Sequence, residues 1–246
     1  MTPKLLTFIF LLLLSPAAHA QTAGDSVTVY YAFPSQCELA TVLSRSCKQV
    51  NTDSILPVFR SDSLSRGQKI FLLGACWFDC ALLIEKNKEK DLLNRFPAIE
   101  KLAQDLQLPG TQNLLARLTE HIRIKDSLLF IFSETGVLFA EFLTENDDAA
   151  AARLFHAGGS FEAVHLFLLS EPKSERKHTY LYDHTFYFSS FLQVPDKDVF
   201  SKQIDGLIAD LLRFSPKNES DFSAEKNNRA DLLRVTRTAR QLMLAR

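Results

Sequence analysis

The chain carries almost no excess of charge of either sign. Its 28 lysine and arginine residues face 29 aspartate and glutamate residues, a formal net charge of −1 at pH 7. A protein that binds nucleic acid usually shows a basic excess gathered on one face. The charge balance therefore predicts no nucleic-acid partner. Cysteine is also scarce, with four residues in 246, so the position of each cysteine along the chain is informative.

A long apolar run is missing as well. The N-terminal run, residues 5–14, is shorter than the roughly 20 residues that a membrane-spanning helix needs. It follows a basic Lys4 and precedes Ala18-His19-Ala20, the order of a secretory signal peptide cleaved after Ala20. No cysteine stands at the cleavage point, so no lipoprotein anchor is indicated. We expect an exported, periplasmic protein that is soluble after cleavage; an uncleaved N-terminal anchor is the alternative.

The rest of the chain is long enough for one domain with appendages. Hydrophobic residues make up 46% of the sequence and include 20 phenylalanines, enough for a large core. We predict a signal peptide at 1–20, one domain at 21–214, and a linker with a basic helix at 215–246.

An exported chain with four cysteines favours disulfides over structural zinc, because that compartment is oxidising. Cys37 and Cys47 lie in a segment, 34–50, that is typical of a helix or a helix with a loop. Their spacing permits a local bridge, so the pair is interpreted as a structural disulfide or as two inert thiols.

Cys76 and Cys80 have a different setting. Residues 69–73 form a short apolar run typical of a strand buried on both faces, and a helix-forming stretch starts near residue 79. This order places both thiols at a strand-to-helix turn. The positive end of the helix dipole would there lower the thiol pKa and favour thiolate. Thiolate is the form that both soft-metal binding and disulfide exchange require.

Apolar runs and helical spacing alternate along the remaining chain. The predicted strands are 127–132, 137–142, 164–169 and an aromatic strand or hairpin at 179–191. The predicted helices are 91–107, 111–123, 147–156 and 196–214. Interleaved strands and helices predict an α/β fold with a mixed sheet flanked by helices.

Two short segments carry a resemblance to a known family. Residues 67–80, which end in Cys76-Trp77-Phe78-Asp79-Cys80, resemble the strand and C-x-x-x-C motif of the SCO/SenC family. Residues 180–185, which contain Asp183-His184-Thr185, look like its histidine motif. The resemblance implies a thioredoxin-like domain with a C-terminal helical tail. It also implies copper ligands at Cys76, Cys80 and His184, with Asp183 orienting the imidazole.

The resemblance implies delivery of copper to the CuA subunit of cytochrome c oxidase, or reduction of its thiols, with a thiol reductant as a further partner. Two thiolates and an imidazole suit Cu(I), and hold Cu(II) with an added weak ligand. Trp77 and Phe78 depart from the family motif. One alternative is a thiol-disulfide oxidoreductase in which Cys76 attacks and Cys80 resolves. The other is a thioredoxin-like binding module with a degenerate site.

The last segment has helical spacing of apolar residues. Leu232, Val235, Ala239, Leu242 and Met243 form one face, with arginines elsewhere, the pattern of a basic amphipathic helix. We expect its apolar face to pack on the domain; contact with an anionic membrane surface is the alternative.

Overall fold

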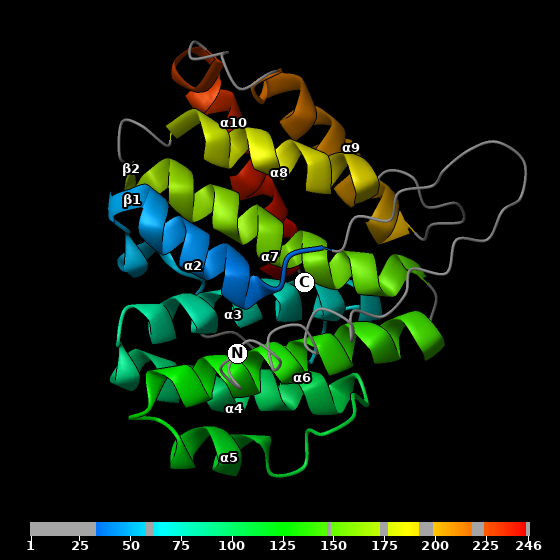
Figure 1. Cartoon of the computed structure of the whole chain (residues 1–246). Coiled ribbons are helices and arrows are strands. Elements are labelled where there is room, and N and C mark those ends of the chain that lie inside the picture. Colours follow the sequence, from blue (N-terminus) through cyan, green and yellow to red (C-terminus); the bar gives the residue numbers. More distant parts are fainter. Residues whose placement is uncertain are drawn as a thin grey trace, which may run out of the picture. The chain divides into compact units, whose positions relative to one another are not determined.

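Helices make up nearly all of the part of the chain that is described (Figure 1). The computed structural model describes residues 33–57, 62–146, 149–172, 177–191, 199–217 and 224–244, so the predicted signal peptide lies outside it. The elements in chain order are α2 (Gln36–Ser46), β1 (Cys47–Gln49), the 3-10 turn η1 (Thr52–Ser54), α3 (Arg66–Glu85), α4 (Glu89–Asp105), α5 (Leu114–Glu120), α6 (Lys125–Asn146), α7 (Ala149–Leu169), β2 (Glu171–Pro172), α8 (Lys177–Phe191), α9 (Val199–Phe214) and α10 (Ala224–Leu244).

The predicted thioredoxin-like mixed sheet is wrong. The only strands in the described residues are β1 and β2, which pair as a short antiparallel ribbon with Cys47 opposite Pro172. The apolar runs that predicted strands lie inside helices: 69–73 in α3, 127–132 and 137–142 in α6, and 164–169 in α7. A short apolar run does not distinguish a buried strand from a helix that is covered on all sides.

Helix α3 begins at a capping box that the turn prediction missed. The Ser65 hydroxyl accepts from the Gln68 backbone N–H at 3.3 Å, and the Gln68 side chain accepts from the Ser65 backbone N–H at 3.0 Å. This reciprocal pair satisfies two backbone donors that a helix start leaves open. Gly67-Gln68 is therefore the first turn of α3, and the helix continues through Cys76 and Cys80.

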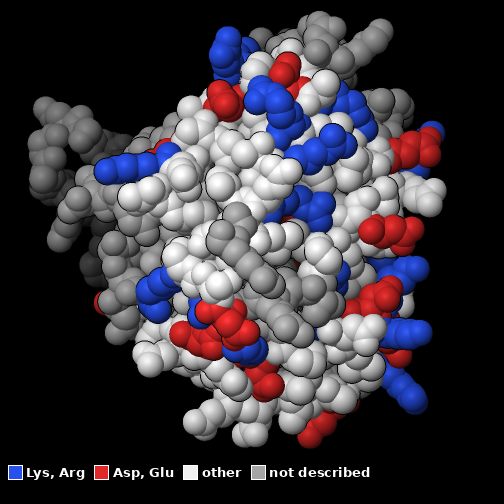
Figure 2. Space-filling view, turned by 180° about the vertical axis from the view of Figure 1, so that it is seen from behind, with Lys and Arg blue, Asp and Glu red and all other residues white. Residues whose placement is uncertain are grey.

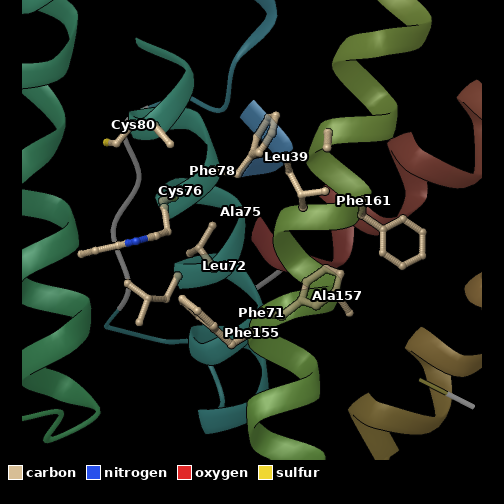
Figure 3. Close-up of a cluster of buried hydrophobic side chains, with 14 of the residues drawn as sticks. Leu39, Phe71, Leu72, Ala75, Cys76, Phe78, Cys80, Phe155, Ala157 and Phe161 are labelled. Carbon is tan, nitrogen blue, oxygen red and sulfur yellow. The ribbon is translucent and has the colours of Figure 1, made fainter. Parts of the chain in front are cut away.

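Glycines let α3 and α7 cross with their backbones in contact. A Cβ atom added at Gly74 would lie 1.8 Å from the Phe155 carbonyl oxygen, and one added at Gly158 would lie 1.9 Å from the Phe71 carbonyl oxygen. Figure 3 shows Phe71 and Phe155 at this crossing. Gly74 and Gly158 are thus sites of close helix packing, and both helices run straight through them.

The outer helices cover this central pair. Helices α2, α4 and α6 pack on α3, while α6, α8 and α10 pack on α7, and α9 packs on α8 and α10 (Figure 1). The α10 residues Leu232, Val235, Ala239 and Met243 are buried as expected. The C-terminal helix is therefore part of the same compact unit, which runs from Phe33 to Arg246.

Two of the described helices, α3 and α6, are long and apolar enough to cross a membrane by length and composition alone. In α3, 89% of the apolar window is buried inside the protein, as in the core helix of a globular domain; in α6 the share is 39%. Phe130, Val137 and Leu138 of α6 are exposed.

Candidate functional site

Cys76 and Cys80 lie in the middle of α3, one turn apart, and both are buried in the core (Figure 3). Neither is at a helix start, so the positive dipole end that was expected to favour thiolate is absent from their surroundings. Burial instead raises the pKa of both thiols, and the charge of Asp79 adds to that effect. Both groups are therefore neutral thiols near neutral pH.

The geometry of α3 also opposes a disulfide between them. Residues four apart on a helix have Cβ atoms about 5–6 Å apart, whereas a disulfide needs roughly 3.5–4.5 Å. The turn of α3 between the two cysteines would have to unwind for the bond to form. The attack by Cys76 and resolution by Cys80 that the oxidoreductase alternative requires have no geometric basis in this helix.

No bridge joins Cys37 and Cys47, because both are reduced cysteines. Cys37 lies in the first turn of α2 and Cys47 follows its last residue. A helical rise of about 1.5 Å per residue separates them by roughly 15 Å, beyond the reach of a disulfide. The Cys37 thiol instead donates a long hydrogen bond to the Leu129 carbonyl at 3.8 Å.

His184 is a buried residue of α8 with an aromatic environment. Its Nδ1 lies 2.8 Å from the Tyr180 carbonyl oxygen, to which Nδ1–H donates, while Nε2 is buried without a partner. The rings of Tyr180 and Tyr187 lie 4.4 and 5.8 Å from the imidazole. Burial lowers the pKa of His184 to about 4, so the ring is neutral at pH 7.

Asp183 does not have the orienting role that the resemblance implied. Its side chain is exposed. The Nδ1 atom of His184, which Asp183 was expected to hold, instead donates to the Tyr180 backbone carbonyl. Within the described residues, no group of three or more His, Cys, Asp or Glu side chains is placed to hold a metal ion. Copper binding by Cys76, Cys80 and His184 stays a prediction from the two motifs.

The native thiols are expected to be inert toward a water-soluble disulfide reagent. Because all four are buried, we expect them in the folded protein to react roughly a hundredfold more slowly than an accessible thiol, and to react fully in denaturant. The reference is Lys202→Cys, at an exposed position of α9. Reaction of Cys76 or Cys80 in the native protein as fast as this reference would restore the redox interpretation.

A groove between α2 and α6 is a second candidate site. It encloses about 730 Å³, and its lining includes Gln36, Cys37, Val42, Val137 and His156. An adjoining hollow of about 360 Å³ shares Phe33, Ala140, Glu141 and His156 with it and extends to Arg153. We call the two together the α2–α6 groove. Each of the two volumes falls within the range of small-molecule sites, about 300–1,000 Å³.

Three polar groups in this groove are buried without a hydrogen-bond partner: Gln36 Nε2, His156 Nδ1 and Arg153 Nη1. Gln36 is 2% exposed. Its side chain lies over Gly159 of α7, where an added Cβ would be 2.8 Å from Gln36 Cγ. A buried donor without a partner costs about 1–3 kcal/mol. The α2–α6 groove therefore holds polar groups that suit an incoming ligand.

His156 is held in place by aromatic contacts. Its ring stacks on Phe33 with centroids 5.1 Å apart and meets Phe155 edge-on at 5.6 Å. Burial lowers the pKa of His156 to about 4. At pH 7 the neutral imidazole can donate through one nitrogen and accept through the other.

The chemistry of the α2–α6 groove favours binding over catalysis. Burial first, and then the charges of Glu38 and Glu85, raise the pKa of the Cys37 thiol to about 12, so it is a poor nucleophile. Glu38 already accepts from Ser35 in the capping box of α2. Val42 and Val137 are half exposed and supply apolar contact area at the mouth.

Sequence reasoning missed this groove. His156 has no other candidate residue near it in the chain, and Gln36 belongs to no motif that predicts a site. The two are 120 positions apart, and they line one groove only because α2 packs on α7. The capping box Ser35-x-x-Glu38, which sets the start of α2 beside Gln36, was the one local signal.

Comparison of the chain with protein-family models, with curated proteins and with solved structures finds no match. The SCO/SenC resemblance therefore rests on the two short motifs alone.

Proposed function

We propose that this protein binds a small, uncharged amphipathic molecule in the α2–α6 groove, with a hydroxyl or carbonyl group of the ligand on Gln36 and His156. The observation that carries the proposal is the buried amide of Gln36, whose Nε2 has no partner. A donor in that position loses its bonds to water on folding and regains one only when an acceptor enters the groove.

Gln36 and His156 are neutral, and the charged residues that line the groove are of both signs, Glu38 and Glu141 with Arg45 and Arg153, so the lining as a whole favours no ligand charge. The Gln36 amide carries no charge, and the low pKa of His156 keeps its ring neutral at pH 7. A hydroxyl group can accept from the amide and donate to an imidazole nitrogen, so it satisfies both. The apolar body of the ligand would lie against Phe33, Val137 and Ala140, which line the same space.

The test compares three probes of similar size: benzyl alcohol, toluene, which lacks the hydroxyl, and benzoate, which is charged. Binding is followed by NMR through the side-chain N–H signals of Gln36. We expect benzyl alcohol to shift these signals and to bind about tenfold more tightly than toluene, the effect of one added hydrogen bond, and benzoate to bind less well than benzyl alcohol.

The variant Gln36→Met keeps an unbranched chain and removes the amide. We expect it to lose the preference for benzyl alcohol over toluene. It should also be more stable than the wild type by about 1–3 kcal/mol, since it removes a buried donor without a partner. Gln203→Met, at an exposed position of α9, is the control and should change neither property. Equal affinity for benzyl alcohol and toluene in the wild type would refute the proposal.

A further inference from the structure

A separate hollow opens between residues 53–57 and α10. It encloses about 580 Å³, with Ile55, Leu56, Leu169 and Leu244 as apolar lining and Arg237 and Arg240 as cationic lining. We call it the α10 groove. Helix α10 runs behind the other helices in Figure 1, and Figure 2 shows lysine and arginine side chains gathered in the upper half of that face.

A buried ionic network lies under this groove. Arg240 Nε is 3.2 Å from Glu162 Oε2 of α7, and that carboxylate is fully buried. Asp79 Oδ2 of α3, also fully buried, accepts from the Leu56 backbone N–H at 3.0 Å and lies 3.6 Å from Arg95 Nη1. Glu162 thereby balances the charge of Arg240 from the interior of the protein.

The same arginines hold the rim of the groove in place. Arg240 Nη2 donates to the Ser54 carbonyl at 2.8 Å, and Arg95 Nη2 donates to the Leu56 carbonyl. Residues 54–56 are therefore tied to α4 and α10 through buried charges. A rim held in this way gives a groove that is formed before any ligand arrives, which lowers the cost of binding.

Of the two arginines that line the α10 groove, Arg237 is the one without an ion pair among the described residues. It lies one turn before Arg240, is exposed and lines the groove. No ion pair or hydrogen bond joins it to any other residue of the described ranges. Its guanidinium presents a planar fork of N–H donors that matches a carboxylate. Beside it, four aliphatic side chains supply a place for a hydrocarbon chain.

We propose that the α10 groove is a second binding site, independent of the α2–α6 groove, for a monocarboxylate with an aliphatic chain. The carboxylate pairs with Arg237, and the chain lies along Ile55 and Leu244. A single anionic group fits because Glu162 already balances Arg240 and because Asp53 at the rim disfavours a second negative charge.

The position of Arg237 among the arginines of α10 distinguishes a free molecule from a lipid surface. The groove is open to solvent and lies between a backbone segment and a helix, with Leu169 as a further wall, and a free carboxylate there pairs with Arg237 alone. A flat anionic bilayer would engage the exposed arginines of α10 together, Arg234 as well as Arg237. A free carboxylate and an anionic lipid surface can therefore be distinguished by the arginine on which binding depends.

The experiment titrates the full chain with octanoate, with octanol as the same chain without the charge, and with vesicles of phosphatidylcholine and phosphatidylglycerol. Methyl signals of Ile55 and Leu244 report occupancy of the α10 groove. We expect saturable octanoate binding with shifts at both methyls, and at least tenfold weaker binding of octanol.

Arg237→Gln is expected to weaken octanoate binding at least tenfold. The matched control is Arg234→Gln on the same helix, because Arg234 is exposed, pairs with Asp231 and does not line the groove. Gln36→Met should leave octanoate binding unchanged, which separates this site from the α2–α6 groove. Octanoate binding that is not saturable, equal losses in the two arginine variants, or binding to vesicles alone would each overturn the proposal.

Discussion

Gly74→Ala is expected to lower the free energy of unfolding by about 3–5 kcal/mol, near the upper end for a single substitution. The added methyl group would stand 1.8 Å from the Phe155 carbonyl oxygen, a backbone atom that no side-chain rotation can move aside. Helices α3 and α7 would have to separate along the contact around which the core is built. Gly158→Ala should act in the same way through Phe71.

Urea unfolding measures this change, with the fluorescence of the single tryptophan as the probe. Trp77 is buried and its indole N–H donates to the Phe132 carbonyl at 3.1 Å, so its emission reports the core. Gly206→Ala is the control, because Gly206 lies in α9 with open space around it and an ordinary helical φ; it should raise stability by about 0.5–1 kcal/mol. Gly74→Ala within 1 kcal/mol of the wild type would contradict the backbone contact.

Should Gly74→Ala fail to fold, Gly136→Ala offers a milder test. Its added Cβ would lie 2.9 Å from Trp77 Nε1, a side-chain atom that can shift. We expect a smaller loss, about 1–3 kcal/mol, together with a change in the tryptophan emission.

Arg240→Met is expected to cost about 3–5 kcal/mol, because it leaves the carboxylate of Glu162 buried without its partner. In the double variant Arg240→Met/Glu162→Gln most of that loss should return, since no buried charge is left unpaired. Arg234→Met removes an exposed pair with Asp231 and should cost less than about 1 kcal/mol. Urea unfolding of the four proteins measures these differences; equal losses in Arg240→Met and in the double variant would contradict the network.

The pH dependence of stability tests the Arg240→Met variant in a second way. Burial first, and then the charge of Asp79, raise the pKa of Glu162 well above its ordinary value. The charge of Arg240 opposes that rise, so in Arg240→Met the pKa of this carboxyl in the folded state is higher still. Its stability should therefore fall as pH rises above the unfolded pKa of about 4.3. The penalty relative to the wild type should be larger at pH 8 than at pH 5.

Where one face of a helix is apolar and the other polar, the sequence predicted the element correctly. Residues 34–50, 196–214 and the C-terminal segment were expected to be helical, and α2, α9 and α10 lie there. In α10 even the buried face was correct, since Leu232, Val235 and Ala239 are at most 1% exposed. Such an apolar stripe is a local property, because its period of 3.6 residues depends only on positions that are close together in the sequence.

Where a helix is covered on all sides, the prediction failed. Helix α3 is buried from Ile70 to Ile84, so its apolar residues show no period and resemble those of a buried strand. Once 69–73 was assigned to a strand, Cys76 and Cys80 moved to a turn, and the reactivity assigned to them followed from that position. The capping box at Ser65 and Gln68 was the local evidence for a helix start.

The sequence by itself determined the amphipathic outer helices and the faces by which they pack, because that pattern depends on neighbours in the chain. Only the tertiary structure decided that the central segments are helices, that Gly74 and Gly158 join their backbones, and that the cysteines and His184 are buried. It alone brought Gln36 to His156 and Arg240 to Glu162. These pairs come from distant segments, and they meet because packing, which has no local signature, places α2 and α10 against α7.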